Sequence, residues 1–282
     1  MSNFHKSVLL KEIIHGLRVE ENKKYIDATL GGGGHAIEIL KRGGEVLGID
    51  ADQEAIDYVK LKVKSEKLIV TKGNFRDIDK IAHLNNFDKA AGIIFDLGVS
   101  SHQIDSHIRG FSFQNEGPLD MRMDQELGVR ALDLIKILRK KELYEIFTKF
   151  GEESRAWEIS EAIVGSRSVK PIETTTDLAK IVFGMAGRSK KVFQALRIAV
   201  NDELNSIMQA LPKALALLEK NGRLCVISFH SLEDRIVKRT FIEFEEKNMG
   251  RIITEKPIVP AASEIEINKR AKSAKLRIFK NI

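Results

Sequence analysis

Three aspartates and a run of glycines have types and spacings that could do chemistry. Asp27, Asp50 and Asp96 each end an apolar segment, and Gly31–Gly34 follow shortly after the first of them. Glycine lets the main chain adopt positive φ and approach a ligand closely, so a glycine run between a strand and a helix forms a crevice at the helix N-terminus. An acid that ends the next strand, as Asp50 does, can accept both hydroxyls of a ribose. The pattern therefore predicts a site for a nucleoside cofactor.

The glycine run alone leaves the identity of that cofactor open. The spacing Gly31-x-Gly33-x-x-Ala36 fits the loose dinucleotide pattern, which indicates NAD and a dehydrogenase. Asp27 favours S-adenosylmethionine (AdoMet), because a carboxylate there suits an ammonium group and would repel a pyrophosphate. A glycine-rich turn without any ligand is the remaining reading. We expect an AdoMet-dependent methyltransferase, with an NAD-dependent dehydrogenase as the alternative.

Asp96 begins the loop Asp96–Ser101, which leaves the fourth expected strand beside this crevice. A methyl acceptor must lie about 3 Å from the methyl carbon and in line with the departing sulfur. An exocyclic amine on a base is a weak nucleophile, and a carboxylate that accepts its N–H bonds returns electron density to the nitrogen. We expect Asp96 to hold such an acceptor and Ser100 to assist it. Contact between Asp96 and the cofactor's own amino group is an alternative role.

His230 leaves the next expected strand at the same rim, ahead of Glu233 and Asp234. The imidazole there is a candidate catalytic acid or base. The same residues also fit an ordinary helix start, with Ser231 as N-cap and the two acids in the first turn. Both readings stay open at this point.

Aromatic and basic residues open the region that follows the Asp96 loop. Phe111 lies in Gly110–Phe113, and Arg122 lies in Gly117–Asp124. Aromatics near an arginine-bearing loop can stack on and clamp a splayed-out base. The alternative is that Phe111 and Phe113 anchor this region to the sheet.

The last fifteen residues, from Asn268 to Ile282, contain six basic residues and no acid. Such a cluster is an electrostatic footprint for a phosphate backbone, and its candidate RNA contacts are Lys272, Lys275 and Arg277. A solvated basic tail is the alternative.

Strand and helix patterns alternate over the first hundred residues. Strands are expected at 24–29, 45–50, 67–72 and 90–96, and helices at 34–42 and 53–65. This alternation predicts a doubly wound α/β sheet with right-handed crossovers, which binds ligands at the carboxyl ends of its strands. Asp27, Asp50, Phe75 and Asp96 fall at or just beyond such ends, so one crevice would gather them.

The alternation breaks after this part of the chain. From about 105 to 190 the sequence reads as loops and helices, the helices at 131–138, 142–149, 153–165 and 176–186. The sheet pattern then resumes, with a long helix near 190–218, a strand at 222–229, a helix at 232–248 and short strands near 251–255 and 275–280. We expect a cofactor domain of residues 1–104 and 191–282, and an inserted helical substrate-recognition domain of residues 105–190.

The composition indicates a globular protein that acts in a reducing compartment. The chain has 282 residues, of which 43% are hydrophobic and 30% charged, with a net charge of +6. No apolar run approaches the ~20 residues that span a bilayer, and Met1–Lys6 lack a secretion pattern. Cys225, the lone cysteine, lies in an apolar run and should be a buried thiol. His102 and His107 lack metal-ligand spacing, so we expect no metal, no membrane contact and a cytoplasmic location.

Seven segments together resemble the signatures of one family, the bacterial 16S ribosomal RNA cytosine-N(4) methyltransferases, or MraW family. The segments are 27–35, 96–101, 110–113, 117–123, 193–201, 227–235 and 271–277. They cover nearly the whole chain in the expected order, and a set of this kind is far more specific than the glycine turn alone. Two stretches depart from the family pattern: His102 stands where proline is usual, and residues 187–192 lack an expected His-Pro stretch.

The resemblance implies a Rossmann-like AdoMet methyltransferase sheet with a helical insertion. It implies methyl transfer to the exocyclic amine of a decoding-centre cytosine in the small ribosomal subunit, by a monomer or a homodimer. The cofactor residues that it implies are Gly33, Gly34, His35, Asp50, Phe75, Asp96 and Gln103. Phe75 would pack near the adenine, or else serve as a core aromatic. A non-catalytic RNA-binding factor that kept the fold is a further alternative.

Overall fold

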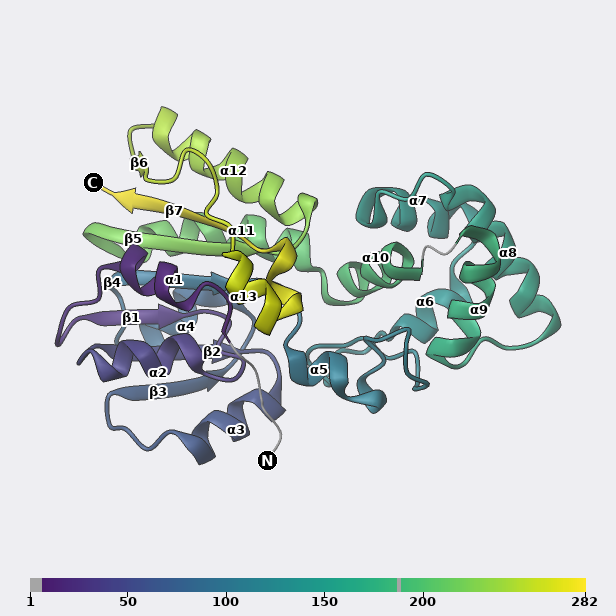
Figure 1. Cartoon of the computed structure of the whole chain (residues 1–282), viewed down its shortest axis with the longest axis horizontal. Helices are drawn as coiled ribbons and strands as arrows, with labels where there is room; N and C mark the ends of the chain where they lie inside the picture. The colour runs from purple at the N-terminus through teal and green to yellow at the C-terminus, as the bar shows by residue number, and fades with distance from the viewer. Residues whose placement is uncertain (1–6, 187–188) are drawn as a thin grey trace. The chain divides into compact units, whose positions relative to one another are not determined.

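A computed structural model of the chain describes residues 7–186 and 189–282. The chain divides into two compact units: one comprises the residues up to Gly98 together with Leu204–Ile282, and the other comprises Val99–Glu203. Figure 1 traces the chain through both. Met1–Lys6, and positions 187 and 188 of the stretch that departs from the family pattern, lie outside the described residues.

The first unit contains a seven-stranded mixed sheet in the order β3-β2-β1-β4-β5-β7-β6. Its strands are β1 (Lys24–Asp27), β2 (Glu45–Asp50), β3 (Leu68–Lys72), β4 (Ala90–Asp96), β5 (Leu218–Ser228), β6 (Gly250–Ile252) and β7 (Lys275–Asn281). The pairings among β1 to β5 are parallel, and β7 runs antiparallel to both β5 and β6. The expected α/β methyltransferase-type sheet is confirmed, with strand bounds close to those read from the sequence.

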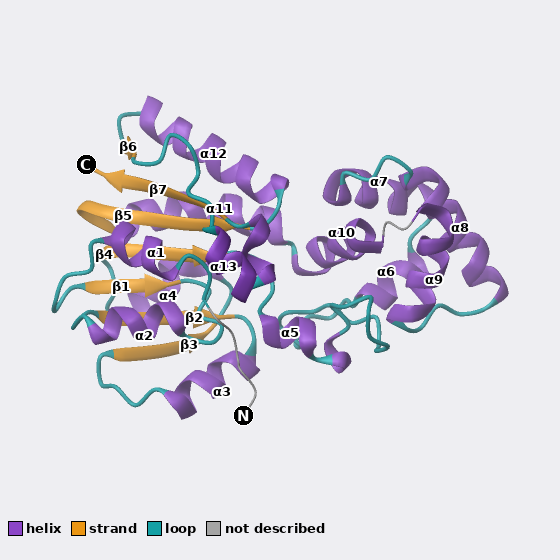
Figure 2. Ribbon diagram, viewed as in Figure 1, coloured by secondary structure: helices purple, strands orange, loops and turns teal. Residues whose placement is uncertain are grey.

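Helices cover both faces of this sheet, as Figure 2 shows. They are α1 (Leu10–Leu17), α2 (Gly34–Lys41), α3 (Gln53–Lys62), α4 (Ile78–Leu84), α11 (Glu203–Leu217), α12 (Ser231–Glu246) and α13 (Ala262–Ile267), with short 3-10 turns η1 (Phe75–Asp77) and η3 (Lys269–Ser273). Neighbouring strand residues point to opposite faces. Tyr25 and Ile94 therefore join a core with α1, α2 and α3, whereas Ile26 and Ile93 join a core with α4, α11 and α12.

The second unit is helical. Its elements are α5 (Ser101–Asp105), η2 (His107–Arg109), α6 (Ala131–Ile137), α7 (Lys140–Gly151), α8 (Ala156–Val169), α9 (Thr175–Ala186) and α10 (Ser189–Asn201). Its core includes Leu119, Phe147, Ile159 and Leu196, all fully buried. A helical insertion between the fourth and fifth strands is therefore present, as expected.

The sequence predicts one long helix near 190–218. This prediction is wrong in one respect, because the structure has two helices there. Asp202 lies between α10 and α11 with φ of 51°, a left-handed conformation that an α-helix cannot contain. Leu196 on α10 packs in the core of the second unit, so this unit extends to Glu203 rather than to residue 190, and it begins at Val99 rather than at 105.

The sequence also predicts that no segment spans a membrane and that Cys225 is a buried thiol. Within residues 7–186 and 189–282, no helix is both long and apolar enough to cross a bilayer. Cys225 is fully buried in β5, and burial raises the pKa of its thiol to about 12. The thiol is therefore part of the core, as expected.

Candidate functional site

Three aspartates end adjacent strands at one edge of the sheet. Asp50, Asp27 and Asp96 are the last residues of β2, β1 and β4, which are parallel neighbours in that order. Asp27 is only 1% exposed, and the side chain of Asp96 is 12% exposed. Grouping three carboxylates that are at least partly buried is unfavourable unless cations or hydrogen-bond donors compensate them. This edge of the first unit is therefore the candidate site.

The glycine turn fits tightly between its neighbours. Gly33 caps α2 in a left-handed conformation with φ of 74°, where a side chain would be strained. A Cβ atom added to Gly33 would lie 3.0 Å from the Val59 side chain, and one added to Gly34 would lie 1.9 Å from Ser7 Oγ. The backbone of this turn thus comes closer to its surroundings than a residue with a side chain allows.

The turn also holds the carboxylate of Asp50. Asp50 Oδ2 accepts a hydrogen bond from the Gly31 amide at 2.7 Å, and Oδ1 accepts one from the Asp52 amide at 2.9 Å. Burial raises the pKa of Asp50 to about 6, although both of these bonds act to lower it. Each carboxylate oxygen has a second lone pair, so Asp50 can still accept hydrogen bonds from the two hydroxyls of a ribose.

Asp27 has an unsatisfied oxygen. Its Oδ1 accepts a hydrogen bond from the Thr29 amide at 3.3 Å, but its Oδ2 is buried and has no hydrogen-bond partner in the described part of the chain. Burial, with the nearby Asp50 carboxylate, raises the pKa of Asp27 to about 7. Buried polar atoms are nearly always satisfied, so Oδ2 is suited to a hydrogen-bond donor that carries positive charge. An ammonium group fits this requirement.

Asp96 is held by its backbone while its carboxylate stays available. The Asp96 amide donates to Thr29 Oγ1 at 2.6 Å, and Oδ2 lies 3.9 Å from His35 Nδ1. Oδ1 is buried without a hydrogen-bond partner among residues 7–186 and 189–282. Burial, then the negative charges of Asp27 and Glu233, raise the pKa of Asp96 well above its usual value. Such a carboxyl group takes up a proton more readily than an exposed aspartate.

Thr29 and His35 support this arrangement. Thr29 is not among the predicted site residues, because a threonine after a strand carries no chemical signature of its own. His35 is 4% exposed, and its Nε2 lies 3.2 Å from the carbonyl oxygen of Val8. Phe75 begins η1 after β3, partly buried, with its ring edge-on to Phe95 at 5.6 Å between centroids. The structure thus places Phe75 near the end of β3 and packs it against the core.

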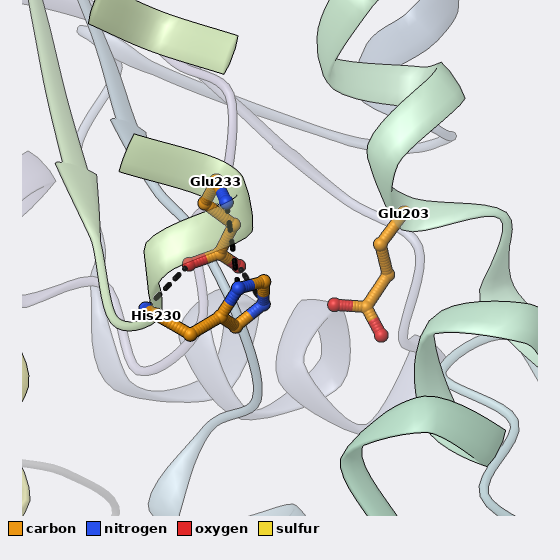
Figure 3. A group of neighbouring side chains, drawn as sticks. All are labelled: Glu203, His230 and Glu233. Carbon is orange, nitrogen blue, oxygen red and sulfur yellow. Dashed lines mark hydrogen bonds and ion pairs between the residues drawn. The ribbon is translucent and has the colours of Figure 1, made fainter. Parts of the chain in front are cut away.

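His230 is the N-cap of α12, whereas the sequence pattern predicted Ser231 for this position. Its Nδ1 accepts a hydrogen bond from the Glu233 amide at 3.4 Å, and Glu233 Oε2 accepts from the Phe229 and His230 amides at 2.7 and 3.2 Å. Figure 3 shows this reciprocal capping arrangement. His230 Nε2 lies 3.2 Å from Glu233 Oε1. The imidazole therefore stabilises the start of α12, whatever chemistry it also does.

Removing the cap should have a measurable cost. We expect His230→Ala to lower the free energy of unfolding by about 1 kcal/mol, because the Glu233 amide loses its acceptor. His230→Asn keeps an acceptor at the N-cap, so its free energy of unfolding should fall by only a few tenths of a kcal/mol. Urea unfolding measures both variants. If both variants lose the same free energy of unfolding, His230 does not stabilise the protein by capping α12.

Ser100 and Gln103 belong to the second unit, unlike the three aspartates. They form the capping box of α5: the Ser100 amide donates to Gln103 Oε1 at 3.0 Å, and the Gln103 amide donates to Ser100 Oγ at 3.2 Å. The structure thus gives local structural roles to the side chains predicted to assist the acceptor and to bind the cofactor.

Phe111 and Arg122 also make contacts within the second unit. Phe111 and Phe113 pack against the core of this unit. The Arg122 guanidinium pairs with both oxygens of Asp120 at 2.8 Å and donates to the carbonyls of Gln125 and Leu127. Arg122 therefore ties its own loop together, and few of its donors remain for RNA.

The basic C-terminal segment is an ordered part of the sheet rather than a solvated tail. Arg277 in β7 is 7% exposed and donates to Asp234 Oδ1 at 2.7 Å, and Lys275 lies 3.2 Å from Asp234 Oδ2. Arg277 is thus a buried ion-pair partner of Asp234, and its role as an RNA contact stays a prediction. Lys272, in η3, is exposed.

Comparisons with known proteins agree over nearly the full length of the chain. The model of the MraW methylase family matches residues 2–282. Ribosomal RNA small subunit methyltransferase H of Carboxydothermus hydrogenoformans is 43% identical over 97% of this chain and 96% of its own length. The proteins of that name from Clostridium botulinum and Halothermothrix orenii are also 43% identical, each over 99% of this chain. A solved rRNA methylase from Streptococcus thermophilus aligns over 98% of both chains with 11% identity and a TM-score of 0.48, too distant to support an argument.

Proposed function

The chain belongs to the MraW methylase family, and we propose that it is an AdoMet-dependent methyltransferase of 16S ribosomal RNA that methylates the exocyclic N(4) amine of a decoding-centre cytosine. The observation that carries this proposal is the group of three carboxylates, one buried and two partly buried, at the ends of β2, β1 and β4; two of them keep a buried oxygen without a partner in the described part of the chain. A cationic cofactor and a hydrogen-bond-donating amine are the two groups that this arrangement suits.

The residues at the sheet edge fit AdoMet better than NAD. Asp27 Oδ2 would pair with the ammonium of the methionine moiety, Asp50 with the ribose hydroxyls and Phe75 with the adenine. When bound, AdoMet supplies an electrophilic methyl group on a sulfonium ion. A pyrophosphate near Asp27 would meet a carboxylate instead of a donor. Calorimetric titrations should therefore show binding of AdoMet and none of NAD.

Asp96 would act on the acceptor. Its Oδ1 is buried and has no hydrogen-bond partner in the described part of the chain, and its raised pKa makes the carboxylate a stronger base than an exposed aspartate. It would accept an N–H of the cytosine amine, orient that nitrogen and take the proton that the nitrogen gives up. The adjacent carboxylates Asp27 and Glu233 sustain this basicity by repelling further negative charge.

The target base must be unpaired or turned out of a helix for its amine to reach this edge. We propose that the helical unit Val99–Glu203 and the C-terminal basic segment present the RNA. The partner would be the small ribosomal subunit in the cytoplasm, and the enzyme would act as a monomer or a homodimer.

A direct test compares small-subunit RNA from cells with and without this gene by mass spectrometry. The RNA from the deletion strain should lack one methyl group on a cytosine, and the purified protein with labelled AdoMet should restore it. RNA of identical mass in both strains, together with no transfer of label to unmodified subunits, would favour the non-catalytic RNA-binding alternative.

The contribution of the C-terminal lysines can be measured separately. Replacing Lys272 and Lys275 together with alanine should weaken RNA binding and reduce the slope of log K against log salt by about 1 to 2, because two phosphate contacts are lost. Lys238→Ala with Arg239→Ala removes two exposed charges from α12 and is the matched control. An unchanged slope in the first variant would remove this segment from the RNA site.

A further inference from the structure

A cavity of about 360 Å³ lies at the opposite edge of the same sheet from the aspartates. Lys23, at its rim, directly precedes β1, Ala91 lies at the start of β4, and Arg223 in β5 pairs with Gly92 of β4. These strands run parallel, so their amino-terminal ends share one edge, at the left of the sheet in Figure 1. Asp96 follows Ala91 by five residue steps along β4, which puts about 16 Å between the two edges. The proposed cofactor site does not use this cavity.

Most of the charged residues that line the cavity are cations. Its charged residues are five basic ones, Arg18, Lys23, Lys220, Arg223 and Lys280, and two acidic ones, Glu20 and Glu219. Lys23 pairs with Glu219 at 3.0 Å. No carboxylate among the described residues pairs with Arg18, Lys220 or Lys280. The cavity therefore carries excess positive charge that the protein itself does not neutralise.

Arg223 is the unusual member of this group, because it is 92% buried yet has no ion-pair partner among residues 7–186 and 189–282. It is 8% exposed, and one of its terminal nitrogens donates to the Gly16 carbonyl at 2.9 Å. Burial, followed by the positive charge of Arg18, lowers the pKa of Arg223. A buried guanidinium normally lies against a carboxylate or a phosphate, since the charge is costly to desolvate alone. The hydrogen bond to Gly16 fixes its position at the cavity wall.

We propose that this cavity binds a phosphate group, with Arg223 as the buried anchor and Arg18, Lys220 and Lys280 as the surrounding cations. Guanidinium and phosphate match in charge and geometry, and a phosphate would relieve the repulsion between Arg18 and Arg223. The same chemistry serves a free phosphate-bearing molecule or a phosphodiester of the RNA backbone. Binding of an RNA phosphodiester rests on the proposed function, because it makes this edge a contact for the RNA substrate. Binding of a free phosphate-bearing molecule does not rest on it.

Inorganic phosphate is the first probe. The melting temperature of the full-length protein should rise saturably with phosphate, beyond the effect of chloride at equal ionic strength. Arg18→Ala with Lys220→Ala, which changes two exposed side chains, should weaken phosphate binding about tenfold or more. Arg223→Lys keeps the charge but loses the planar fork, so it should also bind phosphate less tightly. Lys238→Ala with Arg239→Ala is the control and should bind like the unmodified protein.

The second arm measures binding of unmodified small-subunit RNA over a range of salt. If the Arg18/Lys220 variant also loses RNA affinity, and its slope of log K against log salt falls by about 1 to 2, the phosphate group belongs to the RNA. If only the binding of inorganic phosphate falls, the phosphate group belongs to a free molecule. Both results support the site. It is overturned if phosphate stabilises the protein no more than chloride, or if the Arg18/Lys220 variant and the control lose phosphate affinity equally. AdoMet titration of each variant should be unchanged, which separates failure of this site from failure of the proposed function.

Discussion

Replacing Asp96 with asparagine should lower the rate of methyl transfer by about 10²- to 10⁴-fold, the range expected when a positioned general base is removed. Asparagine keeps the size of the side chain and its carbonyl oxygen, but it cannot take up a proton at neutral pH. Asp96 Oδ1 is buried and has no hydrogen-bond partner among residues 7–186 and 189–282, so it can accept an N–H of the acceptor amine. Single-turnover transfer of labelled methyl to unmodified small subunits, with AdoMet saturating, measures the effect on the chemical step.

Two controls keep this result interpretable. Titration with AdoMet shows whether Asp96→Asn still binds the cofactor, and thermal unfolding shows whether it folds. If the rate falls because AdoMet no longer binds, Asp96 contacts the cofactor, which is the alternative role considered above. Full turnover in a folded variant would remove Asp96 from the reaction altogether.

The pH dependence of the same step provides an independent reading. The pKa of Asp96 lies well above the usual aspartate range because of burial and the charges of Asp27 and Glu233. A base with such a pKa must lose its proton before it can accept another, so the single-turnover rate should rise with pH through that raised pKa. In Asp96→Asn this rising limb should disappear while a small residual rate persists.

The sheet edge that gathers the aspartates follows from local sequence. Parallel strands are buried on both faces and read as short apolar runs, which end where a charged residue appears. The strand expected at 90–96 is found at those residues, and the one expected at 45–50 is found there too. Because ligands of such sheets bind at the carboxyl ends of the strands, Asp27, Asp50 and Asp96 could be grouped without coordinates.

The partners of the basic residues could not be predicted in the same way. Arg277 lies in a segment without acids, yet it pairs with Asp234, 43 residues away in sequence, because β7 and α12 pack in the same unit. Arg122 is bound by carbonyls whose positions depend on the path of its own loop. A count of charges along the sequence gives the number of cations in a segment but not how many are already neutralised.

The broken helix at Asp202 has a related cause. The helical pattern of α10 continues into α11 without a glycine or a proline at the junction, and Pro212 lies well inside α11. A single left-handed residue separates the two helices. Helical periodicity does not detect one such residue, because the apolar positions on either side still satisfy the same spacing.

Asp27→Asn should reduce AdoMet affinity by about 10- to 100-fold, because a hydrogen bond to a charged group contributes about 1.5–3 kcal/mol. Asparagine has nearly the same shape, but it cannot neutralise an ammonium group and offers an amide in place of one carboxylate oxygen. Calorimetric titration at pH 7.5 measures the loss. Asp57→Asn, which removes an exposed carboxylate from α3, is the matched control and should bind AdoMet normally.

The pKa of Asp27 also fixes the sign of two pH dependences. In the folded protein it is raised to about 7, so between pH 4 and 7 the native state holds a proton that the unfolded chain has released. The resulting stabilisation of the ligand-free protein is complete below about pH 4 and is lost as pH rises through 7. AdoMet binding needs the carboxylate, so AdoMet affinity should rise with pH up to about 7, with release of a proton.

These opposite trends distinguish a ligand-binding carboxylate from one that stabilises the fold. If Asp27 binds the cofactor, Asp27→Asn should flatten the dependence of both stability and AdoMet affinity on pH. Above pH 7 the ligand-free variant should be more stable than the unmodified protein, although it binds AdoMet more weakly. Urea unfolding and calorimetry between pH 5 and 8 provide both profiles. A variant that is less stable at pH 8 yet binds AdoMet with unchanged affinity would assign Asp27 to the architecture of the sheet, and the ammonium would then have to bind elsewhere.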